Sequence, residues 1–460
     1  MADGTDEVKT SSTKEPDPKT LRRAIAASAI GNATEWFDYG VYAYTAKMIG
    51  EAFFPSDNPT VSTIGSLSVF ALSFLIRPIG GLVWGPLGDR LGRKKVLATT
   101  ILMMAGATFC LGLLPGYGTL GILAPIGLIL LRMVQGFSTG GEYGGAATFM
   151  AEYAPDHKRG KLGSFLEFGT LAGLTFGATL ALVIELIVGP EAMADWGWRL
   201  PFLVAAPLGL VGLFLRSKLE DPPLFQECES AGQLETETKT QFKDLFVYWP
   251  SLLQLCGLVV ALNVANYTLL SYMPSYLEGQ IGLTTRESLI LIIIGQAAMM
   301  LFLPFSGAFS DRVGRKPMWW FSLIGLFVMA IPMYKLMGQG FTQAIIAFAV
   351  LGLLYIPQLS TISATFPAMF PTHVRYAGFA IAYNVSTSLF GGTAPLVNEA
   401  MVAGTGDKIF PAYYMMAACV IGAIALWFVP ETRGCSLRGR GLPGIDSKPV
   451  KPPARVKANA

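Results

Sequence analysis

The sequence predicts an all-α membrane protein with twelve transmembrane helices, arranged as two pseudo-symmetric six-helix bundles. The first observation is composition: 52% of the residues are hydrophobic, only 14% are charged, and the mean hydropathy is +0.49. These values lie far from those of soluble domains, so we expect the bilayer to be the main solvent. The second observation is a charged segment that occurs twice, about half the chain apart.

Each copy of this segment lies at the C-terminal end of a long apolar stretch. The first copy reads Gly85-Pro-Leu-Gly-Asp89-Arg90-Leu-Gly92-Arg93-Lys94, and the second reads Gly307-Ala-Phe-Ser-Asp311-Arg312-Val-Gly314-Arg315-Lys316. A shorter repeat follows the fourth apolar run of each half, as Pro155-Asp-His-Lys-Arg159 and Pro371-Thr-His-Val-Arg375. The chain is therefore predicted to consist of two parallel halves.

Twelve apolar stretches are long enough to cross a membrane, because a spanning helix needs about 20 mostly apolar residues. Gly and Pro interrupt several of them, as is common in membrane helices. Their approximate bounds are 23–49, 61–87, 96–114, 120–149, 162–188, 199–216, 249–277, 287–309, 318–337, 342–368, 377–401 and 409–429.

The domain organisation follows from these spans. The longest internal polar stretch, at the middle of the chain, is the natural linker between the halves. We expect an N-terminal tail (1–22), an N-terminal six-helix bundle (23–216), a central loop (217–248), a C-terminal six-helix bundle (249–429) and a C-terminal tail (430–460).

The placement of lysine and arginine predicts the orientation, since cytoplasmic loops carry the excess of positive charge. If both termini are cytoplasmic, 27 of the 34 lysines and arginines lie on the cytoplasmic side. We therefore expect a multi-pass protein of the cell (inner) membrane with both termini inside. The positive residues are scattered among loop ends. The net charge of +3 therefore reflects the orientation in the membrane, and we expect no nucleic-acid partner.

Ionisable groups inside the predicted helices are candidates for function, because each costs about 2.5 to 3.5 kcal/mol to place at the bilayer centre. In the first span, Asn32, Glu35, Asp38 or Tyr39, and Tyr42 recur every three or four residues. The fourth span presents Arg132, Gln135, Thr139 and Glu142 on one face, and the second span adds Arg77. Glu35 and Arg77 lie at comparable depths, so we expect Glu35 or Asp38 to pair with Arg77.

Such a pair allows two readings. It can be a permanent structural contact, in which the carboxylate never titrates. Alternatively, an arginine exchanges partners as the halves rock, and the carboxylate that it releases into a site of low polarity binds a proton. The candidates for proton coupling are, in order, Glu35, Asp38 and Glu142, with Glu167 of the fifth span next.

Substrate chemistry is suggested by the aromatic and amide side chains. A quaternary ammonium group favours aromatic faces, and a carboxylate favours arginine, so a small zwitterion would satisfy both. Of the five aromatics in the first span, we expect three to face lipid or the interface. The candidate substrate-binding residues are Trp36, Tyr39, Tyr42, Arg77, Arg132, Gln135, Asn263, Asn266, Tyr267 and Asn384. A mono- or dicarboxylate held by the two arginines is the alternative.

The repeated charged segment has a physical reading of its own. Gly85 lets helices approach closely, and Asp89 can reach Arg93 one helical turn away. The segment can thus act as a conformational latch, or it can simply hold its loop on the cytoplasmic side. The candidate gating residues are Gly85, Asp89, Arg90, Gly92 and Arg93 in the first copy and Asp311, Arg312 and Arg315 in the second, for which we expect a lesser role.

The Gly-x-x-x-Asp-Arg-x-Gly-Arg-Lys segment resembles the hallmark of the major facilitator superfamily. Further segments resemble its metabolite:proton symporter family, and most of all the proline/betaine transporters. They are Glu35-Trp-Phe-Asp38-Tyr39, Phe74-Leu-Ile-Arg77-Pro78-Ile-Gly80, Arg132-Met-Val-Gln135-Gly136-Phe-Ser-Thr-Gly140-Gly141-Glu142, Trp196-Gly-Trp198-Arg199-Leu-Pro201-Phe202, Tyr272-Met-Pro274-Ser-Tyr276-Leu277 and Phe370-Pro371-Thr372-His-Val-Arg375-Tyr376.

The resemblance implies a secondary active transporter, not an enzyme, that imports proline, glycine betaine or a similar osmolyte with protons by alternating access. It favours a gate at the first charged segment, with Asp89 and the loop arginines holding the halves together at the cytoplasmic face. Proton symport of a carboxylate of the 2-oxoglutarate or shikimate type, or secondary export, are the alternatives. One departure is the Pro-rich tail, which stands where an osmosensing member carries a coiled coil, so osmotic control through that device is not expected.

Other classes of transporter fit less well. The sequence contains no Gly-x-x-x-x-Gly-Lys-Ser/Thr phosphate loop, which disfavours an ATP-driven pump. We expect no cofactor besides the proton as coupling ion and no metal. The expected partners are a small-molecule substrate, protons and membrane lipid, with a monomer sufficient for transport.

Overall fold

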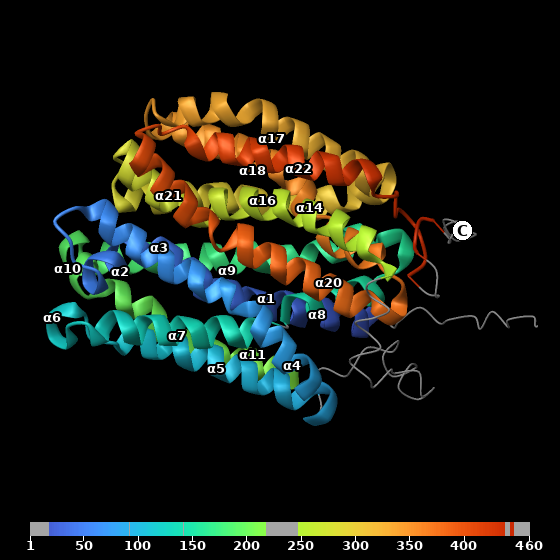
Figure 1. Cartoon of the computed structure of the whole chain (residues 1–460), viewed down its shortest axis with the longest axis horizontal. Helices are drawn as coiled ribbons and strands as arrows, with labels where there is room; N and C mark the ends of the chain where they lie inside the picture. Colours follow the sequence, from blue (N-terminus) through green and yellow to red (C-terminus); the bar gives the residue numbers. More distant parts are fainter. Residues whose placement is uncertain (1–17, 92, 141, 218–246, 438–441, 446–460) are drawn as a thin grey trace, which may run out of the picture.

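The computed structural model describes residues 18–91, 93–140, 142–217, 247–437 and 442–445, and these ranges are almost entirely helical. The long helices run side by side in one direction, with their connections at the two ends of the molecule (Figure 1). We call the end at which residues 430–437 lie the tail side and the opposite end the far side. Most of the predicted N-terminal tail (1–17), of the central loop (218–246) and of the C-terminal tail (438–441 and 446–460) lies outside the described residues.

The N-terminal half contains the blue-to-green helices of Figure 1. They are α1 (Pro18–Tyr44), α2 (Ala46–Phe53), α3 (Pro59–Leu75), α4 (Arg77–Leu91), α5 (Arg93–Leu113), α6 (Tyr117–Leu120), α7 (Leu123–Thr139), α8 (Glu142–Tyr153), η1 (Asp156–Lys158), α9 (Arg159–Val188), α10 (Pro190–Asp195), η2 (Gly197–Arg199) and α11 (Leu200–Ser217).

The C-terminal half contains the yellow-to-red helices. They are α14 (Trp249–Asn266), η3 (Tyr267–Tyr272), α15 (Met273–Tyr276), η4 (Leu277–Ile281), α16 (Thr285–Val313), α17 (Arg315–Met337), α18 (Phe341–Leu359), α19 (Ile362–Thr365), η5 (Pro367–Met369), α20 (Thr372–Ser386), η6 (Thr387–Gly391), α21 (Ala394–Thr405) and α22 (Phe410–Phe428).

Nine helices in the described part of the chain are long and apolar enough to cross a membrane. Three further segments match the remaining predicted spans. They are α1, α5 with its apolar stretch Ala98–Leu113, and the α20–η6–α21 series. The described residues thus account for the twelve spans of the predicted all-α fold.

Several of the predicted spans are not regular α-helices over their whole length. The second span, expected to be continuous over 61–87, divides at Ile76 into α3 and α4. Pro78 follows two residues later and has no backbone N–H, so the ladder of helical hydrogen bonds loses one donor there. The seventh span contains two π-helical turns, η3 and η4, and π-turns are frequent at functional sites. Arg77 begins the segment after the break at Ile76, and Tyr267 is the first residue of the π-helical turn η3.

Glycines set the spacing of helices within the N-terminal half. A Cβ atom on Gly169 or Gly173 of α9 would lie 2.1 Å from the carbonyl oxygen of Ala29 or Ala33 of α1. On the other flank, a Cβ on Gly136 of α7 would lie 1.8 Å from the Ser73 carbonyl oxygen. Small residues of this kind allow membrane helices to pack backbone against backbone.

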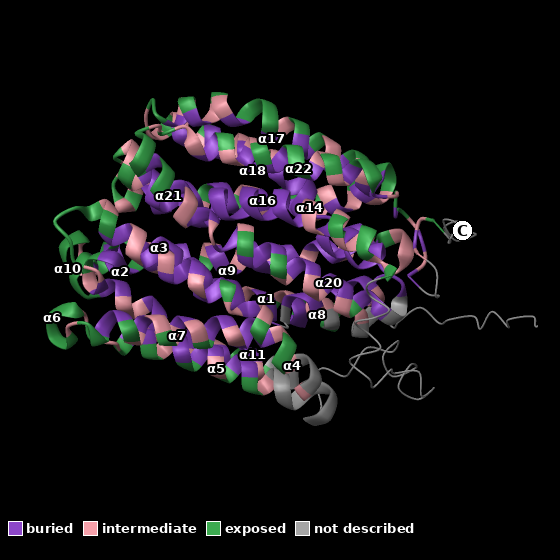
Figure 2. Cartoon of the chain, viewed as in Figure 1, coloured by how far each residue is buried: buried purple, intermediate pink, exposed green. Residues whose placement is uncertain are grey.

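The two halves meet along α9 and α16, with further contacts of α3 with α21 and of α8 with α20. Buried residues gather along these contacts, and exposed residues lie on the outer helices (Figure 2). The exposed side chains include large apolar ones such as Phe305, Phe321, Ile424 and Trp427, which are 61–71% exposed. Such an apolar exterior suits a bilayer as solvent, since lipid tails cover it.

Candidate functional site

The centre of the molecule contains an aromatic cluster built from both halves. Tyr267 of η3 packs its ring against Phe74 of α3, with ring centroids 5.2 Å apart, and against Trp36 of α1 at 6.0 Å. Tyr39 lies 5.0 Å from Phe74 and 6.1 Å from Trp36. Each of these side chains is at most 4% exposed. The cluster is therefore closed to solvent from both sides of the bundle.

Arg77 lies at the edge of this aromatic cluster. Its guanidinium carbon is 4.2 Å from the ring centre of Phe74 and 4.6 Å from that of Tyr39. Its Nη2 lies 3.8 Å from Oε1 of Glu35, which makes a loose ion pair, and neither Nε nor Nη2 has a hydrogen-bond partner. A buried guanidinium with open donors is a ready site for an anionic group.

Arg132 differs in that both of its Nη groups donate within the protein, and only its Nε has no partner among the described residues. It donates to Oε1 of Gln135 at 2.7 Å and to Oγ of Ser73 at 3.2 Å, and it lies over the Tyr42 ring at 4.1 Å. Gln135 continues the network by donating to Thr108 of α5 at 2.5 Å. The predicted substrate residues Arg132, Gln135 and Tyr42 thus form a polar network beside the aromatic cluster.

Asp38 belongs to this second network. The Thr108 hydroxyl donates to its Oδ2 at 2.9 Å. The sequence left Glu35 and Asp38 open as partners of Arg77, and the structure pairs Arg77 with Glu35. The two carboxylates lie about one turn apart on the same side of α1, yet Glu35 contacts Arg77 and Asp38 contacts Thr108.

Glu167 of α9 accepts hydrogen bonds from the hydroxyls of Tyr143 and, at 3.0 Å, Thr170. The Asn32 amide in turn donates to the Thr170 hydroxyl at 2.6 Å. Tyr143 follows Glu142, whose side chain lies outside the described residues. The sequence singled out neither Tyr143 nor Thr170, although Thr170 lies one turn from Glu167 on the same helix face.

The predicted amide residues take different places. Asn263 donates to the Thr387 hydroxyl at 2.8 Å within the C-terminal half, while Oδ1 of Asn266 has no partner. Asn384 donates across the halves to the Gly140 carbonyl oxygen at 2.7 Å. All three lie near the interface of the halves, and their role in binding stays a prediction.

The expected lipid exposure of the aromatics in the first span is wrong. The five side chains are between 0 and 4% exposed. The physical reason is the position of α1, which packs against α9, α11 and η3 and so is surrounded by protein. The buried set consists of Trp36, Phe37, Tyr39, Tyr42 and Tyr44.

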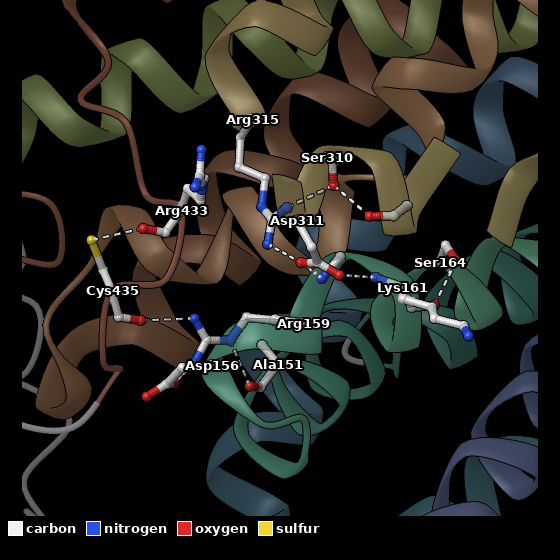
Figure 3. A network of polar contacts seen from close by, with 12 residues as sticks. Ala151, Asp156, Arg159, Lys161, Ser164, Ser310, Asp311, Arg315, Arg433 and Cys435 are labelled. Atoms are coloured by element: carbon white, nitrogen blue, oxygen red, sulfur yellow. Dashed lines mark hydrogen bonds and ion pairs between the residues drawn. The ribbon is translucent and has the colours of Figure 1, made fainter. Parts of the chain in front are cut away.

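On the tail side, the second charged segment joins the two halves (Figure 3). The Asp311 carboxylate accepts hydrogen bonds from the backbone N–H groups of Gly160 at 2.8 Å and Lys161 at 2.9 Å, at the N-terminus of α9. Arg315 holds the same carboxylate at 2.7 Å and donates to the Ser310 hydroxyl at 2.6 Å. Arg312 is exposed. The side chains of the first copy (Gly85, Asp89, Arg90, Gly92 and Arg93) lie outside the described residues.

The arginines of the shorter repeat also connect parts of the tail side. Arg159 donates to the Cys435 carbonyl oxygen at 2.9 Å, and Arg375 donates to that of Leu437 at 2.6 Å (Figure 3 shows the former). Arg375 also pairs with Glu152 of the N-terminal half at 3.1 Å. Residues 430–437 are therefore held by one arginine from each half. In the sequence, the shorter repeat indicated only the duplication of the halves, and the repetition of these arginines was the available signal for this contact.

We expect Asp311→Asn to loosen the tail side. The carboxylate accepts two N–H groups at a helix N-terminus, where negative charge is favoured, and an amide would place its own donors there. Maleimide labelling of a Ser164→Cys reporter, which is buried between α9 and α16, should rise by about 10-fold, equivalent to ~1.4 kcal/mol. The control is Arg312→Gln, which changes an exposed charge in the same loop. Equal labelling of the two variants would contradict the assignment.

The far side is closed as well. Gln296 of α16 donates to the Tyr44 hydroxyl at 2.9 Å and accepts from the Thr175 hydroxyl at 3.1 Å, so it contacts two helices of the other half. Nearer the surface, Arg286 lies 4.0 Å from Glu185. With contacts on both sides and a buried centre, the structure has the occluded arrangement of a two-bundle protein.

Comparisons with known proteins agree with this architecture. The Major Facilitator Superfamily model matches residues 29–395. A proline/betaine transporter of Salmonella typhimurium is 44% identical, covering 95% of this chain and 88% of that protein. A glycine betaine/proline/ectoine/pipecolic acid transporter of Dickeya dadantii is 43% identical, covering 92% and 86%.

Among solved structures, that of the proton:xylose symporter XylE bound to a glucose analogue has a TM-score of 0.73 at 19% identity, covering 91% of this chain and 98% of that one. This likeness shows the fold, and the sequence relatives show the family. The chain is thus a multi-pass membrane protein that belongs to the major facilitator superfamily, within the family of its proline/betaine transporters.

Proposed function

We propose that this protein imports a small zwitterion of the proline or betaine kind together with protons, by alternating access of its two halves. The observation that carries the proposal is the buried Arg77 guanidinium, whose Nε and Nη2 have no hydrogen-bond partner and which faces aromatic rings. A substrate carboxylate would bind these open donors. The substrate cation would lie against the neighbouring rings.

Further buried groups without a hydrogen-bond partner support a ligand site at the same place. Trp36 Nε1 and the Tyr267 hydroxyl are buried and have no hydrogen-bond partner. Buried polar atoms of this kind are rare in native structures and point to a ligand or ordered water. Because Trp36 belongs to α1 and Tyr267 to the C-terminal half, a ligand here would touch both halves at once. Contacts to both halves are what alternating access requires of a central site.

A dicarboxylate is the less favoured substrate. It would call for two available cations, and the Arg132 donors toward Gln135 and Ser73 are already used. One open guanidinium beside aromatic rings fits a single carboxylate with a compact cation. The relatives are named as proline/betaine transporters, which supports the same choice.

The orientation and coupling belong to this proposal too. The tail side is assigned to the cytoplasm of a cell (inner) membrane because of the excess of lysine and arginine in the predicted cytoplasmic loops. The driving ion is the proton, bound by a buried carboxylate. One chain is sufficient, since the central site is formed by the two halves of the same molecule.

The experiment is uptake of labelled glycine betaine, proline and 2-oxoglutarate into proteoliposomes with an imposed inward proton gradient. Accumulation of betaine or proline that a protonophore abolishes is the expected result. Accumulation of 2-oxoglutarate alone would overturn the zwitterion assignment. Uptake that is the same with and without the proton gradient would overturn proton coupling. Net efflux would indicate an exporter.

We expect Tyr267→Leu to weaken betaine binding by about 10-fold or more, because cation–π contacts in a desolvated site contribute about 2 kcal/mol. Tyr267→Phe keeps the ring and removes only the open hydroxyl, so it should weaken betaine binding by about 3-fold, less than Tyr267→Leu does. Binding isotherms of the purified variants measure both values. Equal weakening by both substitutions would show that the ring is not the cation's contact.

A further inference from the structure

Glu167 is a buried carboxyl group that has no cationic partner among the residues that the structure describes. It is 2% exposed and lies on α9, against α1 and α8. Its two oxygens meet the hydroxyls of Tyr143 and Thr170. The charged or titratable groups that face it from the packed elements are Glu35 of α1, Tyr143 of α8, Tyr355 of α18 and Tyr383 of α20, and none of these is a cation.

The charges of the centre do not balance if every group is ionised. Among the described residues there, three carboxyl groups face two guanidinium groups. Arg77 pairs with Glu35, and Arg132 acts on Asp38 through the network of Gln135 and Thr108. This leaves Glu167 unpaired. An unpaired buried carboxylate is costly, and such a group takes up a proton instead.

Tyr383 connects this carboxyl to the other half. Its ring stacks on Tyr143, with ring centroids 4.5 Å apart and an angle of 16° between the planes. The Tyr143 hydroxyl donates to Glu167, so the stacked pair of rings leads from this carboxyl group across the interface to α20. Tyr143 lies on α8 and Tyr383 on α20, both toward the tail side. The stack therefore exists only while the halves are closed there.

We propose that Glu167 carries the transported proton in the closed state and that the Tyr143–Tyr383 stack keeps it there until the halves part on the tail side. This inference rests on the proposed function and names its coupling group. When α20 withdraws, water reaches Glu167 and its O–H proton passes to that water. The carboxylate left behind keeps the Thr170 hydroxyl bond. A hydronium ion from the far side reprotonates it when that side is open, so one proton enters and one leaves in each cycle.

The sequence ranked Glu167 behind Glu35 and Asp38, which both have links to arginine in the structure. Glu35 has the Arg77 guanidinium as a counter-charge and Asp38 is linked to Arg132 through Thr108 and Gln135, whereas Glu167 has only hydroxyl partners among the described residues. Glu399 provides a matched control. It is a buried carboxyl of the C-terminal half that accepts one hydroxyl bond, from Tyr272 at 2.8 Å, and both residues belong to the same half.

The first test is infrared spectroscopy of the purified full-length protein without substrate. The C=O stretching band of a protonated carboxyl group should lose one component in Glu167→Gln, and Glu399→Gln should leave that component in place. A spectrum of Glu167→Gln identical to that of the wild type in this region would overturn the proposal. This test does not depend on which solute is transported.

The second test separates coupling from transport. In proteoliposomes, Glu167→Gln should exchange labelled betaine at a rate within about 3-fold of the wild type but lose gradient-driven accumulation, whereas Glu399→Gln should keep both. Tyr383→Phe retains the stacked ring and should accumulate betaine, and Tyr383→Ala should not. Accumulation by Glu167→Gln would overturn the proposal. Absence of accumulation in the wild type would instead overturn the proposed function and leave the infrared result standing.

Discussion

Replacing Arg77 by glutamine is expected to reduce betaine uptake by about 100-fold or more, which corresponds to ~2.7 kcal/mol of lost binding. The guanidinium is the one buried cation of the described centre whose donors Nε and Nη2 are open, so the substrate carboxylate has no equivalent partner. Substrate affinity should fall together with the rate. Binding isotherms and initial uptake rates measure the two effects.

The substitution also leaves Glu35 without its cation, and breaking a buried pair costs about 3–5 kcal/mol of stability. The double variant Arg77→Gln with Glu35→Gln removes both charges and should restore folding without restoring uptake. Arg77→Lys keeps the charge but not the planar fork of donors, so an intermediate loss is expected. If the double variant takes up betaine at the wild-type rate, Arg77 does not bind the substrate.

The fold could be predicted from the sequence because its two signals are local. Apolar stretches of spanning length and the repeated charged segment are readable without any knowledge of packing. The interruptions could not be placed in the same way. The π-turns that begin at Tyr267 arise from tertiary packing, and the sequence there remains as apolar as a regular helix. The break at Ile76 had a partial signal in Pro78.

The site was predictable on single helices, whereas between helices only the comparable depth of Arg77 and the carboxylates of the first span was, without a choice between Glu35 and Asp38. Spacing of three or four residues correctly grouped Glu35 with Asp38 and Arg132 with Gln135. Spacing could not show that Arg77 pairs with Glu35, or that Tyr143 stacks on Tyr383 from the other half. Such pairings depend on how separate helices are packed together. The lipid exposure expected for three of the five aromatics in the first span was wrong for a related reason. A helix that is surrounded by protein has no lipid-facing side, so the periodicity of its sequence cannot show which residues face lipid.

Gly136→Val is expected to prevent normal folding, with a loss of more than about 3 kcal/mol, at the upper end of the range for overpacked cores. A Cβ atom at this position would lie 1.8 Å from the Ser73 carbonyl oxygen and 2.6 Å from Ile76 Cγ2. Backbone cannot yield as a flexible side chain does, so α3 and α7 must separate. Thermal unfolding in detergent and the yield of monodisperse protein measure the loss.

The separation would reach the functional site through Arg132, which donates to the Ser73 hydroxyl at 3.2 Å, and through Arg77, which follows the end of α3. The matched control is Gly106→Val on α5, where an added Cβ meets nothing within 4 Å. That variant should unfold at nearly the wild-type temperature and keep uptake. Equal loss in both variants would indicate a general intolerance of β-branched residues in these helices. Loss in Gly136→Val alone would show that close contact of α3 with α7 holds both arginines in place.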